Sequence, residues 1–111
     1  MIHCELKYRF EIFVPIKYPD GAEVEPDKVD GVRRELLKKL RGVRGQYQAP
    51  FYGWWISEKE EEVPDEGLLF IADGDRSIQI IQWFQQEYIP KLRADLKQES
   101  IYLTMTEIFW L

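Results

Sequence analysis

The sequence predicts a single α+β domain in which an antiparallel sheet carries two helices on one face. Two observations predict this class. Four segments alternate apolar and polar residues or form short apolar runs, which is typical of β-strands, and two longer segments repeat apolar residues with the period of a helix. The chain has 111 residues, the length of one domain, so we expect residues 1–111 to form one unit.

The first strand is predicted from Cys4 to Val14, where apolar and charged residues alternate. Its more apolar face would cover the core, and its other face would carry Glu5, Lys7, Arg9, Glu11 and Phe13. Such alternation indicates a half-buried antiparallel strand. Pro15 would end it.

The first helix is predicted from Pro26 to Arg41. Its apolar residues recur with the 3.6-residue period of an amphipathic helix: Val29, Val32, Leu36, Leu37 and Leu40. Gly42 is expected to take the left-handed conformation that closes many helices.

A second strand is predicted from Gln46 to Ile56, a segment rich in aromatic residues. Pro50 has no N–H group, so we expect this strand at a sheet edge or with a bulge. An acidic hairpin loop is predicted over residues 57–67. Residues 68–72 form a nearly all-apolar run, as expected for a central strand.

The second helix is predicted to begin after Asp73 or Asp75, either of which could be its N-cap, and to continue to about Lys97. Pro90 lies within its apolar stripe, so we expect one helix with a kink. A last strand is predicted from Ile101 to Trp110.

The resulting order is β-α-β-β-α-β. Right-handed crossovers would place both helices on one face of a four-stranded antiparallel sheet. The sequence therefore predicts a ferredoxin-like two-layer sandwich.

Three segments resemble a loose group of short, uncharacterised bacterial proteins. They are a glycine-containing helix end (residues 42–45), a Gly-aromatic strand (residues 53–55) and a Gln-Glu pair that introduces the last strand (residues 97–102). The resemblance implies the ferredoxin-like fold and no particular activity.

Charge and composition limit the function. The formal net charge of −5 opposes binding to nucleic acid and to anionic membranes, and no apolar run is long enough to span a bilayer. One cysteine and one histidine cannot close a tetrahedral metal site or an internal disulfide. We therefore expect no metal, and the lack of a glycine-rich phosphate loop gives no sign of a cofactor. The N-terminus alternates charged and apolar residues, unlike a signal peptide, so we expect a cytoplasmic location.

The uncovered face of the sheet is the strongest functional clue in the sequence. It is expected to display several large aromatic rings beside charged residues: Arg9, Phe13, Tyr52, Trp54, Tyr102 and Trp110. Exposed apolar patches of this size mark interaction sites. Two interpretations follow, a homodimer formed sheet on sheet and a platform for a planar small molecule.

Two further hypotheses concern other residues. Glu107 interrupts the apolar face of the last strand and is a candidate acid or base in a cofactor-free enzyme of the dimeric α+β barrel type. Arg33, Arg34 and Lys38 form a basic helix face that could contact nucleic acid, although a solvated surface is the simpler explanation.

From these observations the leading expectation is a homodimeric binding or regulatory module that associates through its aromatic sheet face. Catalysis is the second expectation, and nucleic-acid binding is the third.

Overall fold

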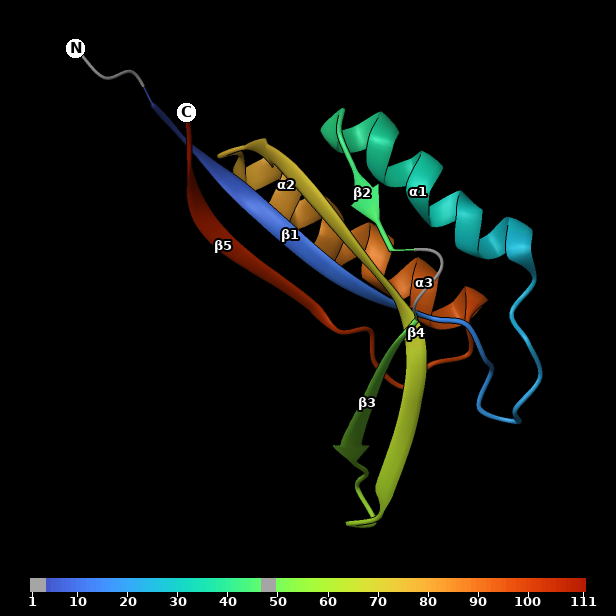
Figure 1. Cartoon of the computed structure of the whole chain (residues 1–111). Helices are drawn as coiled ribbons and strands as arrows, with labels where there is room; N and C mark the ends of the chain where they lie inside the picture. The colour runs from blue at the N-terminus through green and yellow to red at the C-terminus, as the bar shows by residue number, and fades with distance from the viewer. Residues whose placement is uncertain (1–3, 47–49) are drawn as a thin grey trace.

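The computed structural model describes residues 4–46 and 50–111, and it has a mixed α+β architecture with an antiparallel sheet (Figure 1). Its helical elements are α1 (Pro26–Leu40), α2 (Ile78–Trp83), the π-helical turn η1 (Phe84–Tyr88) and α3 (Ile89–Asp95). Its strands are β1 (Glu5–Pro15), β2 (Arg44–Gly45), β3 (Phe51–Ile56), β4 (Glu62–Asp75) and β5 (Leu103–Trp110).

The described strands form one five-stranded sheet, so the prediction of four strands is wrong. Its order is β2-β4-β1-β5, and β3 pairs separately with β4. Among the described residues of the strand predicted over residues 46–56, only β3, from Phe51 to Ile56, is a strand, and the short strand β2 precedes the predicted segment. Part of that predicted strand, residues 47–49, lies outside the described residues.

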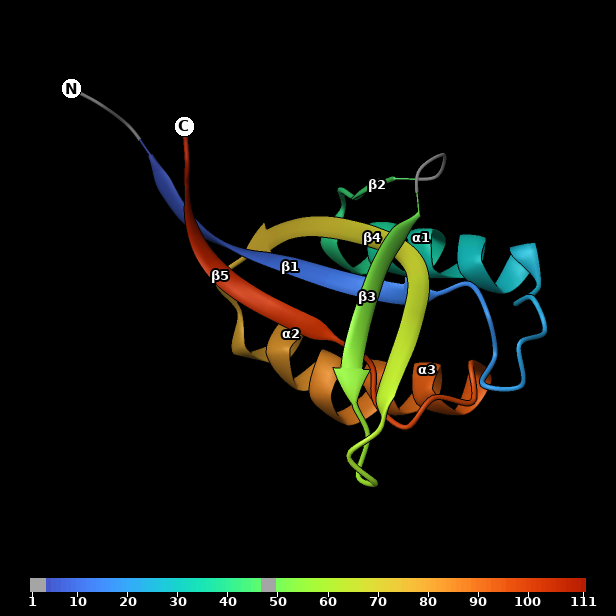
Figure 2. The ribbon, with the colours of Figure 1, turned by 60° about the horizontal axis from the view of Figure 1, so that its bottom comes forward.

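β4 is much longer than the predicted apolar run, because it continues at both ends. Its first part, from Glu62 to Gly67, pairs with β3, and its second part pairs with β1 and β2. Residues 51–67 therefore form a two-stranded hairpin, here called the arm, that extends away from the helices (Figures 1 and 2). Of the acidic loop predicted over residues 57–67, residues 57–61 form the turn at the tip of this arm, whereas residues 62–67 belong to β4.

The second helix begins later than predicted, because β4 continues to Asp75. Asp73 and Asp75 lie within β4, opposite Arg9 and Lys7 of β1. Each carboxylate pairs with the cation facing it across the strands, and such cross-strand ion pairs support strand pairing. Ser77 instead occupies the N-cap position of α2.

The core lies between the helices and one face of the two central strands. Alternate residues of both strands are buried there, as the alternation in β1 predicts: Phe10, Ile12, Val14, Leu68, Phe70 and Ala72. The helices contribute Val32, Leu36, Tyr88 and Leu92. Burial of these stripes is the main force that fixes the helices on the sheet.

Helical backbone runs without a gap from Ile78 to Asp95, in agreement with the prediction that the helix continues through Pro90. Immediately before Pro90 the run contains the π turn η1. Because Pro90 cannot donate a hydrogen bond to the preceding turn, a wider turn accommodates it. At the end of α1, Arg41 rather than Gly42 is left-handed, with φ of 67°.

The described part of the chain is elongated, since its extents are 54 × 31 × 28 Å. Its radius of gyration is 15.1 Å, whereas a compact domain of 100 residues has about 13 Å. The arm and the ends of β1 and β5 both project from the helix-covered part of the sheet (Figures 1 and 2). None of the described helices is long and apolar enough to cross a membrane.

Candidate functional site

The uncovered face of the sheet brings Phe13 and Tyr102 together. The backbone N–H of Phe13 donates to the carbonyl of Tyr102 at 3.0 Å. Both side chains lie on the side of the sheet opposite the core, as the sequence predicts.

Tyr52 and Trp54 do not share that face. Tyr52 pairs with Glu66 and Trp54 with Pro64, so both side chains lie on the side of β4 that further along buries Leu68. They are still 65% and 66% exposed, because the arm extends beyond the helices that cover the core. Phe51 and Trp55 occupy the Phe13 side of the arm instead.

A hollow of about 380 Å³ lies where the base of the arm meets β1 and the segment before β5. We call it the aromatic hollow, because six of its described lining residues are aromatic: Phe13, Phe51, Tyr52, Trp54, Trp55 and Tyr102. The side chains of Tyr52 and Trp54 start from the other side of the arm, so the remaining four residues supply the rings on the Phe13 side. Leu69, Gly53, Gln98 and Ser100 complete its lining with two carboxylates, Asp65 and Glu99.

The charge of the aromatic hollow is negative. Asp65 and Glu99 are its only charged residues among the described ones, and neither lysine nor arginine lines it. Partial burial raises the pKa of Asp65 above its ordinary value, because the arm removes water from the ionised form. A cationic ligand would restore the ionised form.

The chemistry of these side chains defines the ligand that the aromatic hollow could hold. Aromatic faces attract planar rings and cations, including sulfonium and ammonium centres. Carboxylates accept hydrogen bonds from hydroxyl and ammonium groups. A ligand with a planar ring, hydroxyl groups and a positive charge therefore fits this lining.

Two of the predicted face residues lie at the other end of the sheet. Arg9 donates two hydrogen bonds to Asp73, at 2.8 and 3.0 Å, and this arginine holds the pKa of Asp73 below its usual range. Trp110 lines a second hollow of about 550 Å³ between the end of α1 and the last residues of β4 and β5.

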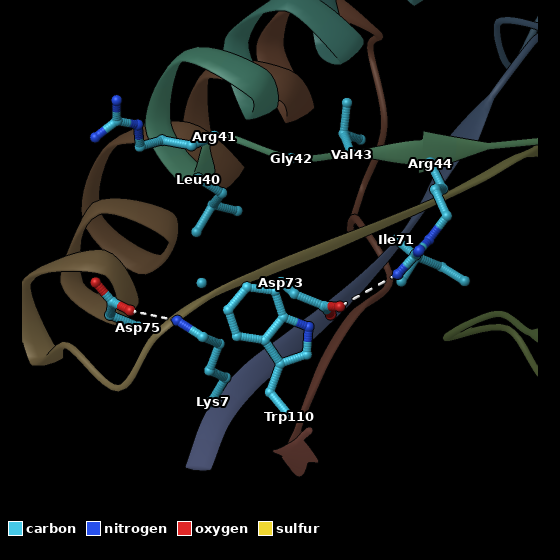
Figure 3. A pocket seen from close by; sticks show the side chains of 11 residues that line it. Lys7, Leu40, Arg41, Gly42, Val43, Arg44, Ile71, Asp73, Asp75 and Trp110 are labelled. Atoms are coloured by element: carbon cyan, nitrogen blue, oxygen red, sulfur yellow. Dashed lines mark hydrogen bonds and ion pairs between the residues drawn. The ribbon is translucent and has the colours of Figure 1, made fainter. Parts of the chain in front are cut away.

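Two of the three cations among the described lining residues of this second hollow, Lys7 and Arg44, already face carboxylates (Figure 3). Lys7 Nζ lies 2.7 Å from Asp75 and 4.5 Å from the centre of the Trp110 ring. Arg44 reaches Asp73 at 3.3 Å. The predicted aromatic platform is thus divided between two places, and only the aromatic hollow combines many rings with uncompensated negative charge.

Glu107 is on the core side of β5, opposite Tyr8, but beyond the cover of the helices. Its carboxylate is 55% exposed and lies 3.7 Å from Arg76. It does not line the aromatic hollow.

The basic helix face is exposed on α1 and partly neutralised there. Arg33 and Arg34 both pair with Asp30 of the same helix, and Lys38 is exposed. Among the described residues, no group of three His, Cys, Asp or Glu side chains is placed to hold a metal ion.

Sequence reasoning missed Asp65 and Glu99. Asp65 belongs to an acidic segment that the composition assigned to a solvated loop, and the strand pairing of the arm, which sets it opposite Gly53, brings it into the same hollow as Trp55 and Gln98. Glu99 is part of the Gln-Glu pair that the resemblance includes, which was the one available signal.

No family model matches the chain, and no curated protein matches it. Among solved structures, the fold is similar to that of a phage SAM lyase determined in complex with S-methyl-5′-thioadenosine. The TM-score is 0.67 at 19% sequence identity, and the match covers 91% of this chain and 81% of that one. At this identity the similarity establishes a common fold.

This similarity corrects the leading functional prediction. The sequence predicts a non-enzymatic binding or regulatory module acting through an aromatic sheet face, and that prediction is wrong. The fold is one used by an enzyme, and the predicted aromatic face is not continuous.

Proposed function

We propose that this protein is an enzyme that cleaves S-adenosylmethionine (SAM) and releases S-methyl-5′-thioadenosine, with the aromatic hollow as its active site. The observation that carries the proposal is the lining of that hollow, which joins six aromatic residues to two carboxylates without a basic side chain among its described residues. The similarity in fold to a SAM lyase supports the same assignment.

The adenine, the ribose and the sulfonium centre of SAM each have a counterpart in the hollow. The adenine ring can stack on one of the aromatic side chains, and the ribose hydroxyls can donate to Asp65 or Glu99. The sulfonium centre can lie over an aromatic face, where the ring quadrupole attracts it.

The reaction needs no second substrate. Release of the thioadenosine breaks the bond between the sulfonium sulfur and the γ-carbon of the amino-acid tail, and the electron pair of that bond passes to sulfur. In the simplest balanced route, an oxygen of the tail's own carboxylate forms a bond to the γ-carbon. The products are then methylthioadenosine and homoserine lactone, with no water consumed and no proton transferred.

The aromatic lining would accelerate this route. A sulfonium cation and a carboxylate anion neutralise each other in the step, so the transition state is less charged than the substrate. Water stabilises the separated charges more than an apolar surface does, so displacement of water from the aromatic rings by the bound substrate lowers the barrier. Binding in a bent conformation would add proximity.

We also infer that the fold is ferredoxin-like, because the strand order and the two helical segments correspond to that arrangement once β2 and β3 are counted as one interrupted strand.

The homodimer predicted from the sequence remains part of the proposal. It is supported by the exposed aromatic side chains of the projecting arm, and native mass spectrometry tests it. SAM is a metabolite of the cell interior, which agrees with the expected cytoplasmic location.

The test is incubation of the purified chain with SAM, followed by mass spectrometric detection of methylthioadenosine and of the tail product. Asp65→Asn and Glu99→Gln are each expected to reduce the rate about 10-fold to 100-fold, the loss of one charge-assisted hydrogen bond. Glu87→Gln, an exposed carboxylate on η1, is the matched control and should retain the rate.

Lactone as the tail product supports the intramolecular route. Methylthioadenosine formation no faster than in buffer would refute the proposed activity. Equal rates in wild type, Asp65→Asn and Glu99→Gln would refute the assignment of the site.

A further inference from the structure

A third hollow, of about 700 Å³, adjoins the aromatic hollow and differs from it in charge. We call it the lysine hollow, because Lys17 and Lys97 line it together with Tyr18 and Glu66. Among the described residues, the two hollows have five lining residues in common: Tyr52, Trp55, Asp65, Gln98 and Glu99. A ligand in the aromatic hollow can therefore extend past these residues into the lysine hollow.

The two lysines differ in their surroundings. Lys17 Nζ lies 3.3 Å from a carboxylate oxygen of Glu66, so its charge is already compensated. Lys97 Nζ lies 5.0 Å from the centre of the Tyr18 ring, and no carboxylate of the described residues comes within 4.0 Å of it. Lys97 is thus the cation of this hollow that remains available to an anionic group.

Lys97 directly precedes Gln98 and Glu99, two of the residues that line both hollows. It has a left-handed conformation, with φ of 55°, and directly follows the last turn of α3. The next residue, Gln98, donates from its side chain to the carbonyl of Leu96 at 3.0 Å. Lys97 lines only the lysine hollow, whereas Glu99 lines both.

We propose that Lys97 binds the α-carboxylate of the amino-acid tail of SAM, and that it selects ligands that carry this carboxylate. The inference rests on the proposed function, in which the nucleoside part occupies the aromatic hollow. The charged lining of the two hollows comprises three carboxylates and two ammonium groups. SAM has two positive charges and one negative charge, which complements this lining.

The same contact explains how the tail would leave. Formation of the lactone converts the carboxylate into a neutral ester, which no longer attracts an ammonium group. The charge that fixes the tail beside Lys97 is therefore removed by the reaction itself. Methylthioadenosine has no tail and makes no use of Lys97.

The experiment compares three ligands by titration calorimetry. Sinefungin carries an amine-bearing carbon in place of the sulfonium sulfur and keeps the carboxylate, so it is not cleaved at that bond. Decarboxylated SAM keeps the sulfonium and the amine without the carboxylate, and methylthioadenosine lacks the tail. Each is titrated into wild type, Lys97→Met, Lys97→Arg and the surface control Lys38→Met.

Lys97→Met is expected to weaken sinefungin binding about 10-fold or more, the value of one hydrogen-bonded charge pair, with no change for the other two ligands. Lys97→Arg should restore the affinity, and Lys38→Met should leave all three affinities unchanged. If Lys97→Met weakens the binding of sinefungin and of decarboxylated SAM equally, or weakens neither, the role of Lys97 is overturned and the proposed function is not affected. A wild-type protein that binds none of the three ligands overturns this inference together with the proposed function.

Discussion

The hydroxyl group of Tyr88 offers the sharpest test of the described core. The residue is 1% exposed, and its ring stacks on Trp83 at 4.6 Å between ring centres. Among the described residues its hydroxyl oxygen is buried without a hydrogen-bond partner. Burial raises the pKa of Tyr88, so the group keeps its proton and remains a donor without an acceptor.

Tyr88→Phe is therefore expected to stabilise the protein. The substitution keeps the ring and its stacking and removes only the hydroxyl group, whose unsatisfied burial costs about 1–3 kcal/mol. We expect the free energy of unfolding to rise by about 1 kcal/mol, which raises Tm by roughly 4 °C in a domain of this size.

The assay is urea denaturation followed by tryptophan fluorescence, with calorimetry for Tm. Tyr18→Phe is the matched control, because the Tyr18 hydroxyl donates to Glu25 and accepts from Lys28 at 2.8 Å. Its removal should lower stability by about 1 kcal/mol. A lower stability of Tyr88→Phe would refute the reasoning, since it would mean that the hydroxyl makes a favourable interaction in the core.

Three further predictions concern the close approach of Gly67 to β1 and two carboxylates. Gly67→Ala should destabilise the protein by about 3 kcal/mol, because a Cβ there would lie 2.3 Å from the carbonyl oxygen of Val14. Gly42→Ala, with no atom within 4 Å of its Cβ, should leave the urea midpoint unchanged, and equal midpoints for both variants would contradict the packing at Gly67. Arg9 lowers the pKa of Asp73, so its stabilisation is complete above the ordinary value of about 4 and is lost as pH falls through the lower folded value. Asp73→Asn should flatten the pH profile of stability in that acid range, and an unaltered profile would refute this. Burial raises the pKa of Asp65, so the affinity for decarboxylated SAM should increase as pH rises from about 4 through that raised value. Calorimetry should find no such increase in Asp65→Asn. A wild-type affinity that does not depend on pH would contradict the contact between Asp65 and the ligand.

The central part of the fold could be predicted because local patterns determine it. The alternation in β1 correctly indicates that Phe10, Ile12 and Val14 are buried, since every second residue of a strand faces the same side. The stripe in α1 likewise indicates the burial of Val29, Val32, Leu36 and Leu40, whereas Leu37, which was included in it, is exposed. Both signals depend on residues near one another in the sequence.

The arm could not be predicted, because its structure depends on pairing between strands. Residues 62–66 are mostly acidic and lack apolar alternation, which favours a loop. They form a strand because each pairs with a residue of β3, from Ile56↔Glu62 to Tyr52↔Glu66. Strand propensity depends on such cross-strand neighbours more than on the residue itself. The same pairing reverses the predicted face of Trp54.

In the candidate site, too, residues in regularly alternating strands could be predicted and residues placed by long-range pairing could not. Phe13 and Tyr102 were predicted to lie on the uncovered face because β1 and β5 alternate regularly. Asp65 lines the aromatic hollow from the arm, and Glu99 lines it from the segment before β5. Neither segment has a periodic sequence pattern from which its position could be predicted. Charged residues in such segments are ordinary in any soluble protein, so composition alone does not distinguish them.

The continuity of β4 through Gly67 separates two tasks within one strand. Residues 68–75 stabilise the fold through their burial and their ion pairs with β1, whereas residues 62–66 belong to the exposed arm that lines the hollows. Substitutions in the arm cost little stability because they remove few buried contacts. Residues of the arm can therefore change, and with them the ligand that is preferred, while the core and the fold stay the same. This architecture favours an evolutionary pattern in which the core is conserved and the arm is variable.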